Sequence, residues 1–260
     1  MGVKPQDKEQ ELLMFNHERK DAYDFLDENF YRVVEAFMER HARPLFTGAH
    51  RVLEAGCGTG AFGRCFIRSL KGRAIWDTTG VDIAPTMIAW NERHPQEHYR
   101  SIVGDLEDTA LFPPETFDLV LCPMVLHHFP NPRAALQNIA AWLKPGGRLY
   151  IIEPNGSSPV NRLSKFIRRC LERTMGLDYT RRFASVNETD HSMRDYSRWL
   201  AQNGLAVRRR ETCLLLSPKR PAGVIHWSRW YLYKLARLLW QPLSGTVLFV
   251  LSQKPEQPAT

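Results

Sequence analysis

The chain has 260 residues, of which 43 % are hydrophobic and 24 % charged, and this composition fits one globular domain of ordinary build. It excludes a disordered, collagen-like or disulfide-stapled chain. The net charge of +7 is unevenly distributed, because residues 1–153 carry 17 basic and 21 acidic side chains whereas residues 154–260 carry 18 basic and 7 acidic ones. We therefore expect the basic part to face an anionic partner: a membrane, a nucleic acid or a phosphorylated small molecule.

Cysteine usage and polarity predict where the protein works. The 5 cysteines include no Cys-x-x-Cys pair, and residues 1–20 are polar and charged, unlike a secretory signal. Free thiols in a cytoplasmic protein are the simplest interpretation. No stretch reaches the roughly 18–20 uninterrupted apolar residues of a membrane-spanning helix. We expect a cytoplasmic protein, peripheral at the membrane if its basic part binds one.

The hydrophobic pattern changes its period along the chain. Residues 8–46 show helical spacing, so we expect 1–46 to form an N-terminal helical lid, with plain core packing as the alternative. Short strands then alternate with helices, which is typical of a parallel sheet covered on both faces. The expected strands are 51–54, 79–82, 99–103, 117–121, 148–153, 205–216 and 246–252. The expected helices are 61–70, 84–92 and 132–143, followed by a Lys-Pro-Gly-Gly turn at 144–147. Residues 47–260 are thus predicted to be an α/β, Rossmann-like, doubly wound domain, whose ligands bind at the carboxyl ends of the strands.

Two insertions, at about 154–190 and 217–244, stand apart from this alternation. Within the first, residues 160–173 have apolar residues at helical spacing with Arg and Lys between them, which predicts a helix capping the substrate site. Within the second, residues 219–240 combine Trp and Tyr with Lys and Arg, a pattern that suits a lipid headgroup region or an extra helix on the sheet edge. We expect the two insertions to form a basic, aromatic surface for an anionic membrane.

A glycine-rich loop, Glu-Ala-Gly-Cys-Gly-Thr-Gly at 54–60, links the first strand to a helix. Glycines permit a tight turn and a close ligand, and the helix N-terminus offers unpaired N–H groups. The loop also fits the dinucleotide pattern, with Asp82 about 20 residues on, so a nicotinamide dehydrogenase is a competitor. Three acids favour another cofactor. Glu54 suits an ammonium group rather than a pyrophosphate, Asp82 can accept both ribose hydroxyls, and Asp105 can accept from an adenine amino group.

Five motifs in order, at 52–60, 80–87, 103–105, 117–129 and 143–154, make the chain resemble the class I S-adenosylmethionine-dependent methyltransferases, most of all their mixed small-molecule branch. The resemblance implies a seven-stranded sheet with an antiparallel last strand, and S-adenosylmethionine as cofactor. It also implies the cofactor-binding residues: Glu54, Gly56 and Gly58 at the methionine end, with Cys57 and Gly60 in the same loop; Asp82 at the ribose; Ile83, Asp105 and Leu106 at the adenine; and Cys122 near the methionine moiety.

His127 and His128 follow the fourth strand on the cofactor side and are the candidate catalytic residues. The sulfonium already activates the methyl group, so the enzyme mainly aligns the acceptor and excludes water. A base helps where the acceptor must lose a proton, and a neutral histidine can accept it. In the alternative, one histidine packs or caps the next helix and the other is solvated. No metal site is predicted, because the histidines and cysteines lack ligand spacing.

The predicted reaction is methylation, first of all O-methylation, of a small hydrophobic or anionic, lipid-like molecule. The alternatives are a phosphorylated soluble metabolite, an RNA, or a non-catalytic scaffold or sensor that binds S-adenosylmethionine. Nucleic acid is the less favoured partner, because the chain has no RNA-binding module and Cys-Pro-Met-Val stands at 122–125, where the signature of exocyclic-amine methylation would be.

Overall fold

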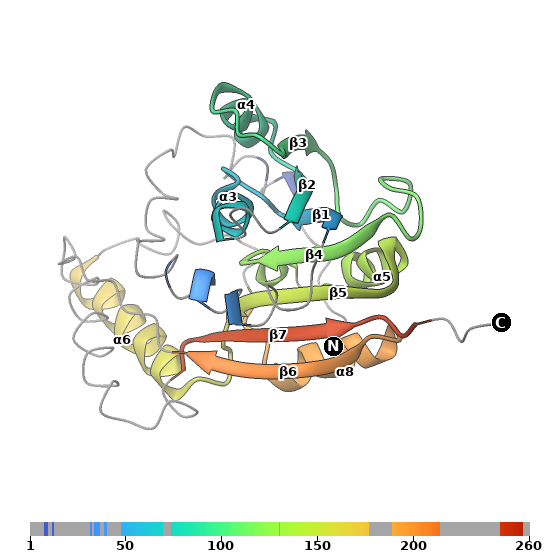
Figure 1. The fold of residues 1–260 in the computed structure, drawn as a ribbon. Coiled ribbons are helices and arrows are strands. Elements are labelled where there is room, and N and C mark those ends of the chain that lie inside the picture. The colour runs from blue at the N-terminus through green and yellow to red at the C-terminus, as the bar shows by residue number, and fades with distance from the viewer. Residues whose placement is uncertain are drawn as a thin grey trace.

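Seven strands form one sheet in the order β3-β2-β1-β4-β5-β7-β6 (Figure 1). The computed structural model describes residues 8–9, 12, 32, 34–36, 39–40, 48–69, 74–129, 131–176, 189–213 and 245–256. The strands are β1 (Gly48–Ala55), β2 (Ala74–Asp82), β3 (Tyr99–Val103), β4 (Phe117–Pro123), β5 (Leu143–Pro154), β6 (Ala206–Cys213) and β7 (Val247–Gln253). Strands β1 to β5 pair in parallel, whereas β7 runs antiparallel to both β5 and β6. The Rossmann-like fold class and its antiparallel last strand are confirmed.

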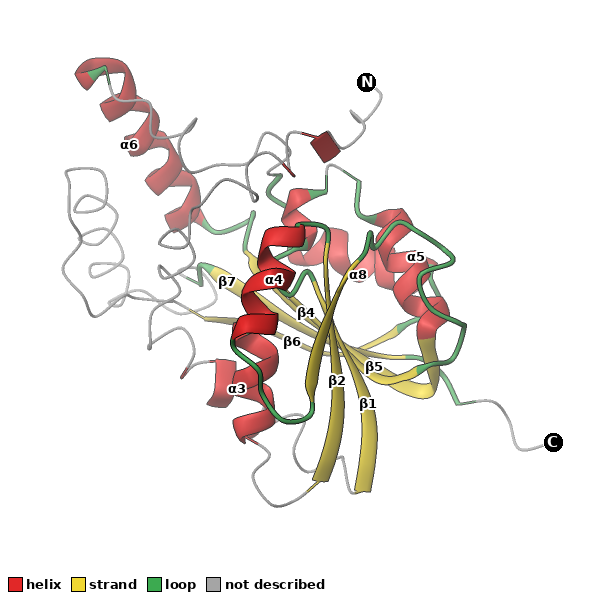
Figure 2. Ribbon diagram, turned by 90° about the horizontal axis from the view of Figure 1, so that it is seen from above, coloured by secondary structure: helices red, strands yellow, loops and turns green. Residues whose placement is uncertain are grey.

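Helices lie on both sides of the sheet, as Figure 2 shows. They are α3 (Ala61–Ser69), α4 (Pro85–Arg93), the short 3-10 helix η3 (Leu126–His128), α5 (Arg133–Trp142), α6 (Pro159–Met175) and α8 (Met193–Gln202). Successive strand residues point to opposite faces. Leu53 therefore joins the core beneath α5 and α8, and its neighbour Val52 joins the core beneath α3. Two buried layers hold the carboxyl ends of the strands in fixed positions.

Several boundaries differ from the sequence-based prediction. The turn expected at 144–147 lies inside β5: Phe117 pairs with Leu143, but Leu119 pairs with Arg148, so the extra residues form a bulge in which Gly146 has a φ of +75°. Helix α8 was not predicted, although its capping box of Ser192 and Asp195 is a sequence signal for a helix start.

The N-terminal part and the second insertion fall mostly outside the described residues. Those described between 8 and 40 are helical, as expected, and Val34 is buried against the α3 core. The lid function and the boundary at 46 stay predictions. Residues 217–244 lie wholly outside the described ranges, whereas the first insertion contains the expected helix, α6. None of the helices that the structure describes is long and apolar enough to cross a membrane.

Candidate active site

The glycine loop after β1 turns sharply toward the carboxyl edge of the sheet. Gly56 and Gly58 have φ values of +65° and +50°, which glycine adopts without strain. A Cβ on Gly56 would lie 2.2 Å from Cγ2 of Val125, so the loop meets the chain after β4 only because this residue is glycine. A Cβ on Gly58 would meet no atom within 4 Å. The space beside Gly58 is therefore open to a ligand, whereas Gly56 is packed closely against Val125.

Asp82, at the end of β2, holds the glycine loop in place. Its Oδ2 accepts the N–H of Gly58 at 2.7 Å, and its Oδ1 accepts the N–H of Ala84 at 3.0 Å. Burial raises the pKa of the Asp82 carboxyl, while these backbone donors oppose that rise. The carboxylate thus stands directly beside the open space at Gly58, with the half-buried Ile83 as its chain neighbour. This arrangement fits the predicted ribose contact.

Glu54 is completely buried at the end of β1. It accepts the hydroxyl of Tyr99 at 2.6 Å and the N–H of Gly63 at 2.9 Å. Burial, the largest cause, raises the pKa of Glu54 to about 7, because removal from water disfavours the charged form. Glu54 therefore ties β1 to β3 and to α3, a role that the sequence did not indicate. Its contact with the methionine end of the cofactor stays a prediction.

Asn91, on α4, is a further support of the loop that sequence reasoning missed. Its Nδ2 donates to the carbonyl of Gly58 at 2.8 Å, and its Oδ1 accepts from Arg64 at 3.2 Å. Cys57 is buried against Asn91, and burial raises the pKa of its thiol well above the usual value. The side chain of Cys57 therefore points into the protein, and only its backbone lies along the open side of the loop. A lone buried Asn on a helix gives no sequence signal for this role.

The predicted adenine edge follows β3. Asp105 accepts the N–H of Glu107 at 2.9 Å, and Lys8 from the N-terminal part forms an ion pair with both acids. Leu106 is buried, and its carbonyl accepts from Asn138 on α5 at 2.9 Å. The N-terminal part of the chain thus reaches the region where the adenine is expected.

Cys122 is placed differently from the other cofactor candidates. Its side chain is fully buried in the core beneath α5 and α8, and burial raises the pKa of its thiol. The candidates at Gly58, Asp82 and Asp105 come together at the edge of the sheet, whereas Cys122 lies under it. Its proximity to the methionine moiety stays a prediction.

A buried carboxylate orients the first candidate catalytic histidine. Nδ1 of His127 lies 2.7 Å from Oε2 of Glu153, whose Oε1 accepts the N–H groups of Val125 and Leu126 at 2.8 and 2.6 Å. A carboxylate oxygen accepts hydrogen bonds, so this contact favours the imidazole tautomer with its proton on Nδ1. No role for Glu153 was predicted from the sequence. Its position was the available signal: Glu153 lies at the end of β5, and β5 is the neighbour of β4, the strand that precedes the two histidines.

The second candidate, His128, stacks obliquely on the first with ring centroids 4.1 Å apart. Burial lowers the pKa of His128 well below its usual value, and the neighbouring His127 lowers it further. His128 is therefore neutral at pH 7. It is half-buried rather than solvated, so the expectation of one solvated histidine is wrong: both rings pack in the turn after β4.

A third histidine, His191, closes this cluster from the segment before α8. Its Nε2 lies 3.1 Å from the carbonyl of Phe129, and the N–H of Thr189 bonds the carbonyl of His127 at 2.7 Å. Burial lowers the pKa of His191. The segment at 189–191 thus crosses the histidine turn and shields it from water. Nothing in the sequence marked His191, because its partners are distant in the chain.

The residues at this edge fit S-adenosylmethionine. The open side of Gly58 admits a close ligand, the Asp82 carboxylate is a pure acceptor for hydroxyls, and Asp105 is an acceptor at the expected adenine edge. Among the described residues, no three His, Cys, Asp or Glu side chains are grouped as a metal site would require.

Comparisons with known proteins point to the methyltransferases. A family model described as a methyltransferase domain matches residues 15–210. A ubiquinone biosynthesis O-methyltransferase of Xylella fastidiosa (strain 9a5c) is 31 % identical over 167 residues, which cover 60 % of each chain. One of Xanthomonas campestris pv. campestris (strain B100) is 35 % identical over 113 residues, 42 % of this chain and 45 % of the relative. The match thus spans less than half the length of this relative.

A solved structure shows the same fold over nearly the whole chain. A chain of the complex between the Haloferax volcanii Trm112 methyltransferase activator and its methyltransferase superposes with a TM-score of 0.68. The match covers 96 % of this chain and 99 % of that one at 18 % identity.

Proposed function

The chain belongs to the class I S-adenosylmethionine-dependent methyltransferases, and from this premise we propose that it methylates an oxygen of a small, lipid-like molecule. The observation that carries the proposal is the Glu153–His127 pair. A hydroxyl acceptor must lose a proton during the transfer, and this pair is built to take one. The two O-methyltransferase relatives support an oxygen acceptor and a lipid-like product class by their names.

The chemistry can be assigned atom by atom on the protein side. When bound, S-adenosylmethionine supplies a methyl group already activated by its sulfonium. A bound S-adenosylmethionine would supply this methyl group to the acceptor oxygen, with the carbon–sulfur bond breaking as the carbon–oxygen bond forms, and the hydroxyl proton would pass to the imidazole ring of His127. Glu153 then stabilises the imidazolium through its bond to Nδ1. The buried surroundings of His127 exclude water, so a hydroxide does not compete for the methyl group.

The cofactor-holding roles belong to the same proposal. Gly58 lets the cofactor approach the backbone, Asp82 accepts the ribose hydroxyls, and Asp105 accepts from the adenine amino group. Glu54 contributes negative charge near the α-ammonium group of the methionine end. Support comes from the open side of Gly58 and from the carboxylates gathered at this edge.

We also propose that the protein acts in the cytoplasm, peripherally at a membrane. A lipid-like acceptor resides in a membrane, and the chain from 154 onward carries 18 basic and 7 acidic side chains, which suits an anionic surface.

The test measures S-adenosylhomocysteine formation with 4-alkylcatechols and 4-alkylanilines of increasing chain length. We expect methylation of the catechols, with kcat/KM rising with chain length. Preferential methylation of the anilines would overturn the oxygen acceptor, and equal kcat/KM for methyl and octyl chains would overturn the lipid-like one.

Two histidine variants test the base. His127→Ala is expected to lower kcat about 100-fold or more, with an unchanged Kd for S-adenosylmethionine. His128→Ala keeps the Glu153–His127 pair and is the matched comparison, expected to retain most activity. A larger loss of kcat in His128→Ala than in His127→Ala would show that His128, and not His127, is the proton acceptor.

A further inference from the structure

The apolar face of helix α6 is only partly buried. Val160 and Ser164 are buried against the protein. Leu163, Phe166 and Cys170 are exposed and follow one another at helical spacing on the outward side. The apolar face predicted from the sequence is therefore buried only in part, and the prediction that it covers the substrate site stays a prediction. We call Leu163, Phe166 and Cys170 the outer strip.

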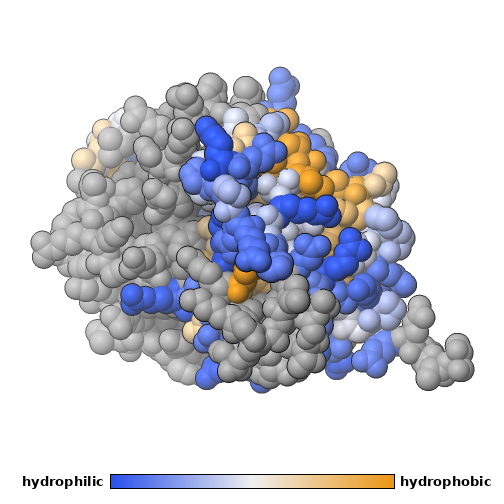
Figure 3. All heavy atoms as spheres, turned by 45° about the horizontal axis from the view of Figure 1, so that its top comes forward, coloured by the Kyte–Doolittle hydropathy of each residue, from blue (hydrophilic) through white to orange (hydrophobic). Residues whose placement is uncertain are grey.

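The outer strip stands out from the rest of the described surface. The exposed large hydrophobic side chains of the described residues are Val103 (51 %), Leu163 (46 %), Phe166 (64 %) and Met175 (50 %), and all but Val103 lie on α6. The described surface on the face drawn in Figure 3 is mostly hydrophilic, and the hydrophobic atoms gathered at its right lie on the side opposite α6, which Figure 1 places at the left. A single exposed hydrophobic residue is normal, but a cluster on one helix marks an interaction site.

A line of cations accompanies the outer strip. Arg162, Arg169 and Arg173 are exposed, and their spacing places them on the side of the helix that carries Phe166. Lys165, by contrast, is engaged in an ion pair with Asp190. Arginine can lay its apolar stem on a hydrocarbon layer while its guanidinium meets phosphates. An apolar strip beside arginines is therefore complementary to an anionic lipid surface.

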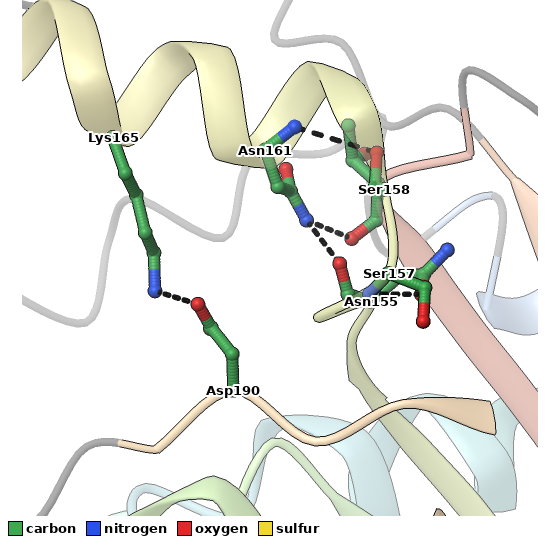
Figure 4. A network of polar contacts seen from close by, with 7 residues as sticks. Asn155, Ser157, Ser158, Asn161, Lys165 and Asp190 are labelled. Carbon is green, nitrogen blue, oxygen red and sulfur yellow. Dashed lines mark hydrogen bonds and ion pairs between the residues drawn. The ribbon is translucent and has the colours of Figure 1, made fainter. Parts of the chain in front are cut away.

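The base of α6 is firmly anchored, as Figure 4 shows. Ser158 caps the helix by accepting the N–H of Asn161. Nδ2 of Asn161 donates to the carbonyls of Asn155 at 3.0 Å and Thr246 at 2.8 Å. These bonds attach α6 to the end of β5 and the start of β7. The outward direction of the helix is thus set by the sheet.

The anchor also places α6 beside the candidate active site. Pro159 begins the helix shortly after Glu153, the residue that orients His127. In Figures 1 and 2, α6 projects away from the sheet at the edge where the parallel strands end. A surface bound by α6 would therefore lie next to the acceptor end of the site.

We propose that the outer strip and its arginines dock α6 into the headgroup region of an anionic bilayer, so that a membrane-dissolved acceptor reaches the site. The inference rests on the proposed lipid-like acceptor. Phe166 and Leu163 enter the interface, and Arg162, Arg169 and Arg173 contact lipid phosphates. An RNA would use the arginines but would leave the apolar strip in water, so the bilayer is the better match.

The experiment is sedimentation of the full chain with vesicles of phosphatidylcholine alone or with about one third phosphatidylglycerol. Leu163→Ser/Phe166→Ser and Arg169→Glu are compared with the controls Val103→Ser and Arg93→Glu, whose positions are exposed on β3 and α4. We expect binding to the anionic vesicles that weakens with salt, a loss of about tenfold or more in both α6 variants, and none in the controls.

Three results would overturn the proposal: equal recovery of the wild type in the supernatant with and without anionic vesicles, unchanged binding in Leu163→Ser/Phe166→Ser, or a short RNA that binds as well as vesicles and is insensitive to that variant. Methylation of a water-soluble short-chain catechol is measured on the same proteins and is expected to be unchanged in the α6 variants. Loss of vesicle binding in the α6 variants with unchanged methylation of the soluble catechol supports docking through α6. Vesicle binding by the wild type without any methylation overturns the proposed reaction and leaves the docking proposal standing.

Discussion

The carboxyl edge of the sheet has two parts that use their carboxylates differently. At β1 and β2, Glu54 and Asp82 accept hydrogen bonds from Tyr99 and from backbone N–H groups, so these acids fix the glycine loop. At β5, Glu153 also accepts from a titratable ring, that of His127. In the proposed function the first part is the cofactor cradle, defined by backbone geometry. The second part, with Glu153 and His127, takes the acceptor's proton in the same proposal.

The cradle is most sensitive to a change at Gly56. Gly56→Ala would place a Cβ 2.2 Å from Val125 and force an alanine to a φ of +65°. We expect the free energy of unfolding to fall by about 3 kcal/mol and the affinity for S-adenosylmethionine to fall about 100-fold, because the loop must move. Urea unfolding and calorimetry measure the two effects.

Gly176→Ala is the matched control for this substitution. Gly176 ends α6 with a φ of +63°, but a Cβ there would meet nothing within 4 Å. Only the backbone strain of about 1 kcal/mol applies, and cofactor affinity should not change. Equal effects of the two substitutions would show that packing against Val125 does not shape the cradle.

We call the second part, with Glu153 and His127, the acceptor part. A substitution there should lower kcat and leave the affinity for S-adenosylmethionine unchanged. Glu153→Gln removes the charge that stabilises protonated His127, so we expect kcat to fall about 30-fold while the Kd for S-adenosylmethionine stays constant. Asp118→Asn is the control, because Asp118 pairs with Lys144 at the far end of β4. A fall in cofactor affinity as large as the fall in kcat would erase the distinction between the two parts.

Glu54 should make cofactor binding depend on pH. Burial raises its pKa from 4.5 to about 7, so the carboxyl is neutral below this pH and becomes negative above it. The α-ammonium group of S-adenosylmethionine should then bind up to about tenfold more tightly at pH 8 than at pH 6. Calorimetry across this range should show a flat profile for Glu54→Gln. The same pH dependence of affinity in both proteins would show that Glu54 does not interact with the methionine end of S-adenosylmethionine.

The smallest effect is expected at the N-terminal ion pair. Lys8 contacts Asp105 and Glu107, and its side chain is 38 % exposed. Lys8→Ala should change the Kd for S-adenosylmethionine by less than about threefold, because exposed pairs contribute little. Lys144→Ala, at a comparably exposed pair with Asp118, is the control. A tenfold loss confined to Lys8→Ala would show that the N-terminal part acts as a lid over the cofactor.

The positions of the glycine loop and of the acids at the sheet edge were predictable because their determinants are local. Residues 54–60 run from the end of β1 into one loop, Asp82 ends β2, and Asp105 follows β3. Parallel strands bring such ends together, so spacing in the sequence becomes proximity in the fold. The supports of this loop were not predictable. Tyr99 and Asn91 reach it from different elements, and their roles depend on side-chain packing.

The acceptor part was only half predictable for the same reason. His127 and His128 were recognised by position, but the partner that orients His127 is 26 residues away on β5. On α6, helical spacing predicted a helix correctly and its apolar side incompletely. Periodicity reports which residues share a face, whereas the contacts of Asn161 with the sheet decide which face turns outward.

The position of β7 between β5 and β6 has a consequence for the order of folding. Strand β6 precedes β7 in the chain but reaches the sheet only through it, since β6 pairs with β7 and β7 pairs with β5. During synthesis β6 therefore has no partner in this sheet until the later strand has left the ribosome. The arginines at 208–210 in β6 would then discourage this unpaired strand from pairing with other chains.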